Sequence, residues 1–282
     1  MAGPDKIWER IAGALERLSP PNNAGAETGA YGDVDWTAHP AYVWDGSRVR
    51  AIETLDTVGL DTLKGLDEHK QAVLANLERF AKGAAAHDML LWGARGMGKS
   101  ALIRAAIVNL ANERAYNVAL VQITSDCLPS IADLLAELGK QTRSFLLFID
   151  DLGFGAGDTQ DNLALRSLLD GGVIPRPSNI RLAVTSNRRA IVARDWDESQ
   201  ARHERDERDN ALALADRFGL TLGFHPCDQA TYLEILHAYT DPLGIDVDEG
   251  EALRWAIARG SRSGRSAYQF ACELAGRAGL SL

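Results

Sequence analysis

A glycine-rich loop joins an apolar run to a helical pattern, and this junction constrains the fold more than any other feature. The loop Gly93-Ala94-Arg95-Gly96-Met97-Gly98-Lys99-Ser100 follows Met89–Trp92 and precedes Ala101–Leu110. Glycines let backbone N–H groups surround phosphates, Lys99 supplies a positive charge, and the Ser100 hydroxyl can ligate Mg²⁺. The helix directs its positive end at the anion. A turn with an incidental lysine is the alternative, but the flanking strand and helix favour a nucleoside triphosphate site formed by the loop and Ala101.

Strands and helices alternate around this loop. A helical stretch over Glu68–Phe80 comes first, and the runs that read as strands are Met89–Trp92, Val118–Ile123, Phe145–Ile149, Ile180–Thr185 and Leu220–Gly223. Two further helices are expected near residues 130–141 and 163–169. Strands separated by helices predict a parallel sheet that is covered on both faces. We therefore expect a three-layer α/β domain.

The pattern becomes helical only after Pro226. Residues 229–239, 248–259 and 265–278 each have helical periodicity, which predicts a smaller, all-helical C-terminal domain. The chain thus divides into residues 1–54, an α/β domain over residues 55–225 and a helical lid over residues 226–282.

The first 54 residues are expected to contain a helix, a tether and a docking segment. Apolar residues at helical spacing predict an amphipathic helix over residues 5–18, and Pro20–Gly32 has the composition of a flexible tether. Trp36, Tyr42 and Trp44 follow. Packing of these aromatic side chains onto the main domain's own core is the common use, and gripping a partner is the alternative.

Composition excludes several classes of protein. With 282 residues and 46% hydrophobic residues, the chain can bury one large core or two modest ones. Cys127, Cys227 and Cys272 are far apart, so neither a disulfide framework nor a zinc site is indicated. The N-terminal residues form no apolar signal core and no apolar stretch approaches the ~18 residues of a membrane span, so we expect a cytoplasmic protein.

The charge of the chain gives a weaker indication of what it binds. The net charge of −9 argues against broad, nonspecific binding to nucleic acid. Five arginines nevertheless gather near the C-terminus, and they read as a solvated helix face or as a local patch for DNA: Arg254, Arg259, Arg262, Arg265 and Arg277. The mixed-charge run from Arg188 to Asp209 is expected to be a solvated helix or a mobile segment.

Two carboxylates end the apolar run Phe145–Ile149. In a parallel sheet with a phosphate loop, ligands gather at the carboxyl edge of the strands, so Asp150 and Asp151 should face the nucleotide. Asp150 is suited to holding Mg²⁺, and Asp151 to orienting or polarising the attacking water. The alternative is a strand end whose aspartates only begin a loop.

Asn187 follows another expected strand at the same edge of the sheet. Its amide could bond the γ-phosphate or the attacking water. An asparagine after a strand is often a turn residue, and the surrounding motifs favour the functional interpretation.

Together these residues resemble an AAA+ ATPase from about residue 55 to the C-terminus. The resemblance implies that Asn187 is sensor 1, that Asp216-Arg217-Phe218-Gly219 carries an arginine finger at Arg217, and that Gly264-Arg265 carries sensor 2 at Arg265. It also implies that Leu63 and Leu66 flank the adenine.

Several stretches are more closely similar to an uncharacterised bacterial family of AAA+ ATP-binding proteins, known as a domain of unknown function. They are Leu91–Gly96, Thr185–Arg189, Asp216–Leu220, Gly223–Pro226 and Arg262–Arg265. The resemblance implies a fold and an ATPase, and leaves the pathway open.

One residue departs from the pattern of most AAA+ ATPases, which have Glu after the metal-binding Asp. Asp151 occupies that position, as in the replication-initiator and helicase-loader branch. A carboxylate one methylene shorter reaches about 1.5 Å less far, and a misplacement of that size can cost on the order of 100-fold in rate. We therefore expect slow hydrolysis, typical of a timed switch.

The two arginines have different implied roles. Arg217 would reach the γ-phosphate bound to a neighbouring subunit, so hydrolysis would require a homo-oligomer, whereas Arg265 would act within its own subunit and couple the phosphate state to the lid. The alternatives are a surface Arg217 paired with Asp216 or another acid, and an Arg265 that is one more solvated arginine.

The sequence therefore predicts a cytoplasmic, Mg²⁺-dependent ATPase that changes the conformation of a partner, with a protein favoured over DNA and no membrane. A nucleotide-gated adaptor with negligible turnover is a second hypothesis, which Asp151 supports. A small-molecule kinase fits the sensor-like residues poorly, and the chain lacks the Asn-Lys-x-Asp element that reads guanine.

Overall fold

The computed structural model describes residues 28–29, 34–124, 127–128, 131–152, 159–170, 175–187 and 213–282. The helix expected over residues 5–18, most of the tether and the charged run over residues 188–209 lie outside these ranges. No helix within the described ranges is both long enough and apolar enough to cross a membrane.

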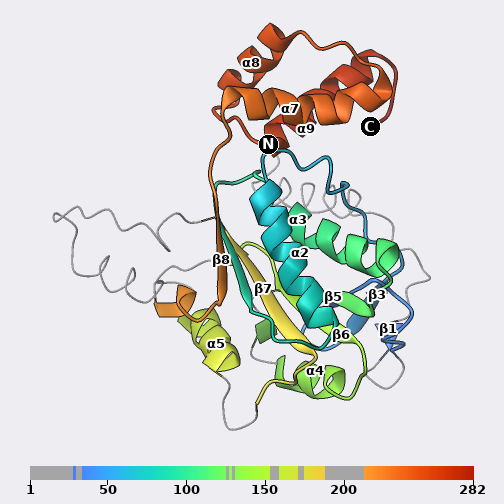
Figure 1. Ribbon diagram of the computed structural model, residues 1–282, viewed down its shortest axis with the longest axis vertical. Helices are drawn as coiled ribbons and strands as arrows, with labels where there is room; N and C mark the ends of the chain where they lie inside the picture. The colour runs from blue at the N-terminus through green and yellow to red at the C-terminus, as the bar shows by residue number, and fades with distance from the viewer. Residues whose placement is uncertain are drawn as a thin grey trace, which may run out of the picture.

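The centre of the molecule is an eight-stranded sheet with the order β1-β3-β2-β5-β6-β7-β4-β8 (Figure 1). Neighbours from β2 through β5, β6, β7 and β4 to β8 are parallel, whereas β3 is antiparallel to both β1 and β2. The strands are β1 Thr28–Gly29, β2 Ala41–Trp44, β3 Val49–Ile52, β4 Met89–Gly93, β5 Val118–Ile123, β6 Ser144–Ile149, β7 Ile180–Ser186 and β8 Leu220–Phe224. All five strands predicted from the sequence are present, and their ends differ from the prediction by at most one residue.

Helices cover both faces of the sheet, which confirms the predicted three-layer arrangement. They are α2 Asp67–Ala81, α3 Lys99–Val108, α4 Ile131–Leu138 and α5 Thr159–Asp170. Strand β6 shows why two covers are needed: Phe145, Leu147 and Ile149 join one core with α4 and α5, and the alternate residues Leu146 and Phe148 join the other core with α2 and α3. A strand that is buried on both faces has no polar face that could contact solvent.

A hairpin extends the sheet on the N-terminal side of the expected domain boundary at residue 55. Between β2 and β3 the Asp45 carboxylate accepts the backbone N–H groups of Ser47 at 2.9 Å and of Arg48 at 2.7 Å, which closes the turn. Trp36, Tyr42 and Trp44 are buried in the core that contains α4 and α5, so the predicted packing of these aromatics is confirmed. Thr28 and Gly29, inside the expected tether, pair with β3.

The helical region after residue 226 lies at one end of the sheet (Figure 1). Its helices are α7 Gln229–Thr240, α8 Glu249–Ala258 and α9 Gly264–Arg277, and they share a separate small core around Tyr232, Leu236 and Phe270. Aspartate and serine N-caps begin these helices. Ser263 forms a capping box with Ser266 at the start of α9.

Most of the lid arginines are engaged within the lid. Arg277 pairs with Glu251 at 2.7 Å and with Glu273 at 3.0 Å, and Arg254 lies 3.8 Å from Asp248. Arg259 stacks over the Trp255 ring at 4.5 Å. The cluster therefore resembles the solvated, acid-paired helix face more than a free basic surface.

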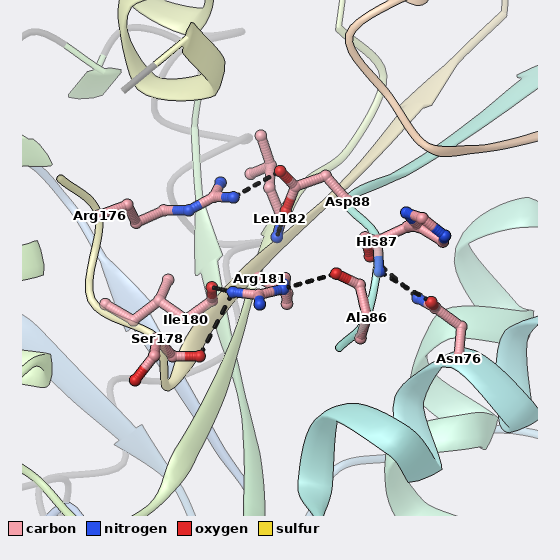
Figure 2. A network of polar contacts seen from close by, with 9 residues as sticks. All are labelled: Asn76, Ala86, His87, Asp88, Arg176, Ser178, Ile180, Arg181 and Leu182. Carbon is pink, nitrogen blue, oxygen red and sulfur yellow. Dashed lines mark hydrogen bonds and ion pairs between the residues drawn. The ribbon is translucent and has the colours of Figure 1, made fainter. Parts of the chain in front are cut away.

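A polar network fixes the start of β4, at the edge of the sheet opposite to the lid (Figure 2). The Asp88 carboxylate pairs with Arg176 at 2.5 Å and accepts the backbone N–H of Leu182 at 2.8 Å. The buried Asn76 side chain from α2 bonds both backbone groups of His87 at 2.9 Å. Because a buried backbone polar group without a partner is costly, these contacts hold the beginning of β4 against both β7 and α2.

Candidate active site

The candidate site lies where β4, β6 and β7 end side by side. Trp92 of β4 is in register with Ser186 of β7, and Ile149 of β6 is in register with Val184 of β7. The residues after these strands therefore meet at one edge of the sheet. This is the edge that faces the helical lid (Figure 1).

The phosphate loop requires glycine for two physical reasons. Gly93 has φ 117°, and a Cβ there would lie 2.1 Å from the carbonyl oxygen of Phe224. Gly96 has φ 74°, and a Cβ there would lie 2.9 Å from the Cβ of Arg265. Both positions combine left-handed backbone with close approach of a neighbour, which only glycine allows without strain. Helix α3 begins at Lys99, within the last two residues of the loop motif.

Lys99 is almost fully buried, with 6% of its surface exposed. Its Nζ donates to the carbonyls of Gly93 at 2.9 Å and Ala94 at 2.8 Å, and to Oδ1 of Asn187 at 3.0 Å. Burial lowers the pKa of Lys99, although Asp151 and Asp150 act in the opposite direction. A cation held by oxygen atoms at a helix N-terminus is suited to meeting the β- and γ-phosphates.

Asp150 and Ser100 lie together at the mouth of the loop. The Ser100 hydroxyl donates to Oδ1 of Asp150 at 2.5 Å, and the buried Thr185 hydroxyl donates to the same oxygen at 2.6 Å. The carboxylate is exposed. Exposed hydroxyl and carboxylate oxygens at a phosphate site are the ligand types that Mg²⁺ prefers.

Asp151 adopts an uncommon backbone conformation, with φ 57°. Its backbone N–H donates to Oγ1 of Thr185 at 2.8 Å, and its carboxylate accepts a hydrogen bond from the side-chain amide of Asn187. Asn187 thus links Lys99 to Asp151, because its oxygen accepts from one and its nitrogen donates to the other. Aspartate tolerates the left-handed region better than most residues, which suits it to this position.

The lid contacts the phosphate loop directly. The backbone N–H of Arg265 donates to the carbonyl of Gly96 at 3.0 Å. Gly264 sits so close to the same carbonyl that a Cβ there would lie 3.1 Å from the oxygen. The start of α9 is therefore in contact with the loop. The positive charge of Arg265 also acts on the loop, because it contributes to lowering the pKa of Lys99.

A cavity of about 410 Å³ brings most of the predicted residues together. Those that line it are Leu63, Leu66, Gly96, Met97, Gly98, Lys99, Ser100, Ala101, Asp150, Asp151, Asn187 and Arg265. The carbonyls of Gly93 and Ala94 bond the Lys99 ammonium group, and Arg95, in the same loop, is exposed.

Sequence reasoning missed other residues that line this cavity. Tyr239 of α7 and Tyr268 of α9 form an edge-to-face pair with ring centroids 5.3 Å apart, and Val58, Thr62 and Ile235 line the cavity as well. Nothing in their helical or loop patterns distinguishes them from core residues. Thr185 did carry a signal, because it is a polar residue inside an apolar strand.

Arg217 does not reach this cavity. Strand β8 runs parallel to β4, so the turn before β8 lies at the opposite edge of the sheet from the phosphate loop. There the Arg217 Nε bonds Asp170 at 2.5 Å, and its Nη1 bonds the carbonyl of Ala213. The pairing with an acid that the sequence left open is therefore present, with Asp170 rather than Asp216 as the hydrogen-bonded partner.

Comparison with known proteins gives the fold a context. The family model described as "Protein of unknown function (DUF815)" matches residues 37–278. No curated protein matches the chain.

Solved structures of AAA+ ATPases are similar to this chain in fold. Two mutants of RuvB from Thermotoga maritima align with TM-scores of 0.50 and 18% identity over 77% of this chain. The Orc1 protein of Aeropyrum pernix, in complex with DNA, aligns with a TM-score of 0.54 and 15% identity over 80% of this chain and 66% of Orc1. The chain spans 64% of the RuvB proteins that it matches. At these identities the likeness shows the AAA+ P-loop fold alone, and it confirms the fold predicted from the sequence.

Proposed function

The chain belongs to the family described as "Protein of unknown function (DUF815)", and we propose that it is a Mg²⁺-dependent ATPase of the AAA+ type that hydrolyses ATP slowly and only when assembled. The conformational change that follows would act on a partner, with a protein favoured over DNA. The cytoplasmic location expected from the sequence stays a prediction.

The observation that carries this proposal is the position of Asn187 between the cation and the carboxylate. Its amide oxygen accepts from Lys99 at 3.0 Å and its amide nitrogen bonds Asp151. A single side chain thus connects the group suited to the phosphates with the group suited to the attacking water. This arrangement supports a hydrolytic site more strongly than a site that only binds phosphate.

The residues around Asp150 fit a magnesium ion. Ser100 and Asp150 offer oxygen ligands alone, and within the described part of the chain no group of three or more His, Cys, Asp or Glu residues is gathered as a metal site. Mg²⁺ commonly uses one or two protein ligands and completes its shell with water and phosphate oxygens. Ser100 and Asp150 would therefore hold the ion, which would neutralise charge on the phosphates when bound.

The side chains of this chain divide the reaction between them. Lys99 would bind the β- and γ-phosphates, and Asp151 and Asn187 would orient a water molecule in line with the γ-phosphate. Arg265 would stabilise negative charge from the lid side of the same subunit. Arg217 of a neighbouring subunit would supply further positive charge, and a contribution of this kind is worth roughly 10³–10⁵ in rate.

Asp151 supports slow turnover. Its short side chain is bonded to Asn187 and its backbone is in the left-handed region, so the carboxylate has limited freedom to follow the water. Misplacement of a catalytic group by about 1 Å can cost on the order of 100-fold in rate.

The contact between Gly96 and Arg265 supports a conformational output. Because the lid touches the loop that would hold the phosphates, the contacts of Arg265 would differ between the ATP and ADP states. A ligand shifts a conformational equilibrium by its difference in affinity for the two states. The lid angle is the coordinate that we expect to change.

The test measures phosphate release by the purified protein over a wide range of protein concentration. We expect turnover per subunit to rise with concentration, and to be lost in Lys99→Ala and Asp151→Asn proteins. An Asp151→Asn protein that hydrolyses ATP as fast as the parent would exclude Asp151 from the mechanism.

The restrained Asp151 carboxylate also favours a second candidate, a nucleotide-gated adaptor that binds ATP with negligible turnover. The same measurement separates the two functions. Tight ATP binding with no phosphate release at any protein concentration would support the adaptor and contradict the ATPase.

A further inference from the structure

Arg217 and Asp170 form an ion pair at the edge of the sheet opposite to the phosphate loop. Asp170 is the last residue of α5, and Arg217 lies in the turn before β8. The side chains are 33% and 52% exposed. Exposed ion pairs contribute little to folding stability, so a role of this pair in orienting Arg217 can be tested separately from folding.

The contacts of Arg217 fix the plane of its guanidinium group. Nε bonds Oδ1 of Asp170 at 2.5 Å, and Nη1 bonds the carbonyl of Ala213. Among the hydrogen bonds of the described residues, none engages Nη2. Since the arginine donors form a rigid planar fork, two bonded nitrogens set the direction of the third. The hydrogen bond that Arg217 donates to Asp170 also raises the pKa of Arg217.

The chain on either side of this pair is anchored to the start of β4. The backbone N–H of Leu220 donates to the carbonyl of Asp88 at 3.2 Å, and Gly219 packs against the His87 ring, where a Cβ would lie 2.2 Å from Nδ1. Arg176, which follows α5, pairs with the Asp88 carboxylate (Figure 2). The turn that carries Arg217 is thus held to the start of β4 by described contacts, and this gives the guanidinium a defined base.

We propose that Asp170 is the positioning residue of Arg217: it fixes the guanidinium so that Nη2, which bonds none of the described residues, projects toward the nucleotide of a neighbouring copy of this chain. The inference rests on the proposed function, in which Arg217 acts on a neighbouring subunit. A flexible arginine would have to be ordered each time a site assembles, whereas a fixed one already has its productive orientation.

Single variants test the orientation. We expect Asp170→Ala to lower ATP turnover about 100-fold, as a misplaced catalytic group does, and to leave ATP affinity at the parent value. Asp170→Asn retains an oxygen that accepts from Nε and should retain most of the turnover. The double variant Asp170→Ala/Arg217→Ala should be no slower than Arg217→Ala alone, because both changes remove the same contribution.

Glu273→Ala is the matched control. Glu273 is an exposed acid paired with Arg277 at 3.0 Å, outside the cavity. Its removal deletes a comparable ion pair and should leave turnover and melting temperature unchanged. Melting temperatures of the Asp170 variants should also match the parent, which separates positioning from folding.

Mixtures of variants show in which subunit Asp170 acts. Lys99→Ala subunits cannot use their own loop but still offer an intact Arg217. Asp170→Ala protein mixed with Lys99→Ala protein should therefore regain turnover, and Asp170→Ala mixed with Arg217→Ala should not. A defect confined to the Asp170→Ala subunit's own site would not be rescued by Lys99→Ala.

The outcomes distinguish the two proposals. If Arg217→Ala mixed with Lys99→Ala regains no activity, Arg217 does not act between subunits, and the assembly-dependent mechanism and the role of Asp170 are both wrong. If that mixture is active but Asp170→Ala turns over like the parent, or is not rescued by Lys99→Ala, the positioning role alone is overturned.

Discussion

The Thr185 hydroxyl donates a 2.6 Å hydrogen bond to Asp150 and accepts a 2.8 Å bond from the backbone N–H of Asp151. One buried hydroxyl thus connects the residue suited to holding the metal with the residue suited to orienting water. The left-handed backbone of Asp151 is held in place by this bond and by the bond from Asn187.

Thr185→Val should separate these roles from packing, because valine keeps the shape of threonine and lacks the hydroxyl. The N–H of Asp151 loses its partner, and we expect a loss of about 1–3 kcal/mol in the free energy of unfolding. Asp150 also loses one of its two hydroxyl donors and keeps only Ser100, so half-maximal turnover should require several-fold more Mg²⁺. Urea denaturation and a magnesium titration of turnover measure the two effects. Thr185→Ser should behave as the parent, and a Thr185→Val protein with the parent's magnesium requirement would contradict this role.

Asp151→Glu tests whether the short carboxylate limits the rate. The longer side chain reaches about 1.5 Å further, and we expect turnover to rise by an order of magnitude or more, within the ~100-fold that a misplacement of that size can cost. Glutamate tolerates φ 57° less well than aspartate, so the melting temperature should fall slightly. Single-turnover phosphate release is the measurement. Slower release by Asp151→Glu than by the parent would show that the reach of residue 151 is not limiting.

Ser263→Ala tests the contact between the lid and the phosphate loop. Ser263 caps α9 by accepting the N–H of Ser266 at 3.2 Å, and its hydroxyl oxygen lies 3.0 Å from where a Cβ of Gly96 would be. Loss of the cap should cost about 1 kcal/mol of stability. Because α9 begins at the loop, ATP affinity should fall as well. Calorimetric unfolding and ATP titration measure both, and Thr231→Ala on α7 serves as a control that leaves the start of α9 intact.

Strands and their functional ends could be predicted from the sequence because the two signals coincide. The run Phe145–Ile149 is apolar at every position and stops at Asp150, so the buried strand and the polar site at its end are marked by the same residues. The hairpin of β2 and β3 is not marked by such a pattern in the sequence. Strands β2 and β3 have four residues each, too few to separate a strand from an aromatic loop that packs on the core.

The remaining parts of the site depend on contacts between distant residues. Tyr239 and Tyr268 come together only because α7 and α9 pack side by side over the loop, and their spacing along the chain resembles that of core residues. The pairing of Arg217 with Asp170 joins two segments across the edge of the sheet, and a sequence alone has no measure of that approach. Roles that come from strand order were therefore predictable, and roles that come from tertiary packing were not.

Because Lys99 is buried, we expect the free energy of unfolding to depend on pH. Burial is the main cause that lowers its pKa below the ordinary value of 10.5. Between the lowered pKa and 10.5 the unfolded chain binds a proton that the folded chain has released, so the contribution of Lys99 to the free energy of unfolding rises with pH across that window. Below the lowered pKa both states are protonated and the slope vanishes. Urea denaturation without nucleotide, compared between the parent and Lys99→Met from neutral pH to pH ~10, isolates this contribution. The difference in unfolding free energy, parent minus variant, should increase toward alkaline pH, and parallel curves would show that the buried ammonium does not titrate differently in the folded protein.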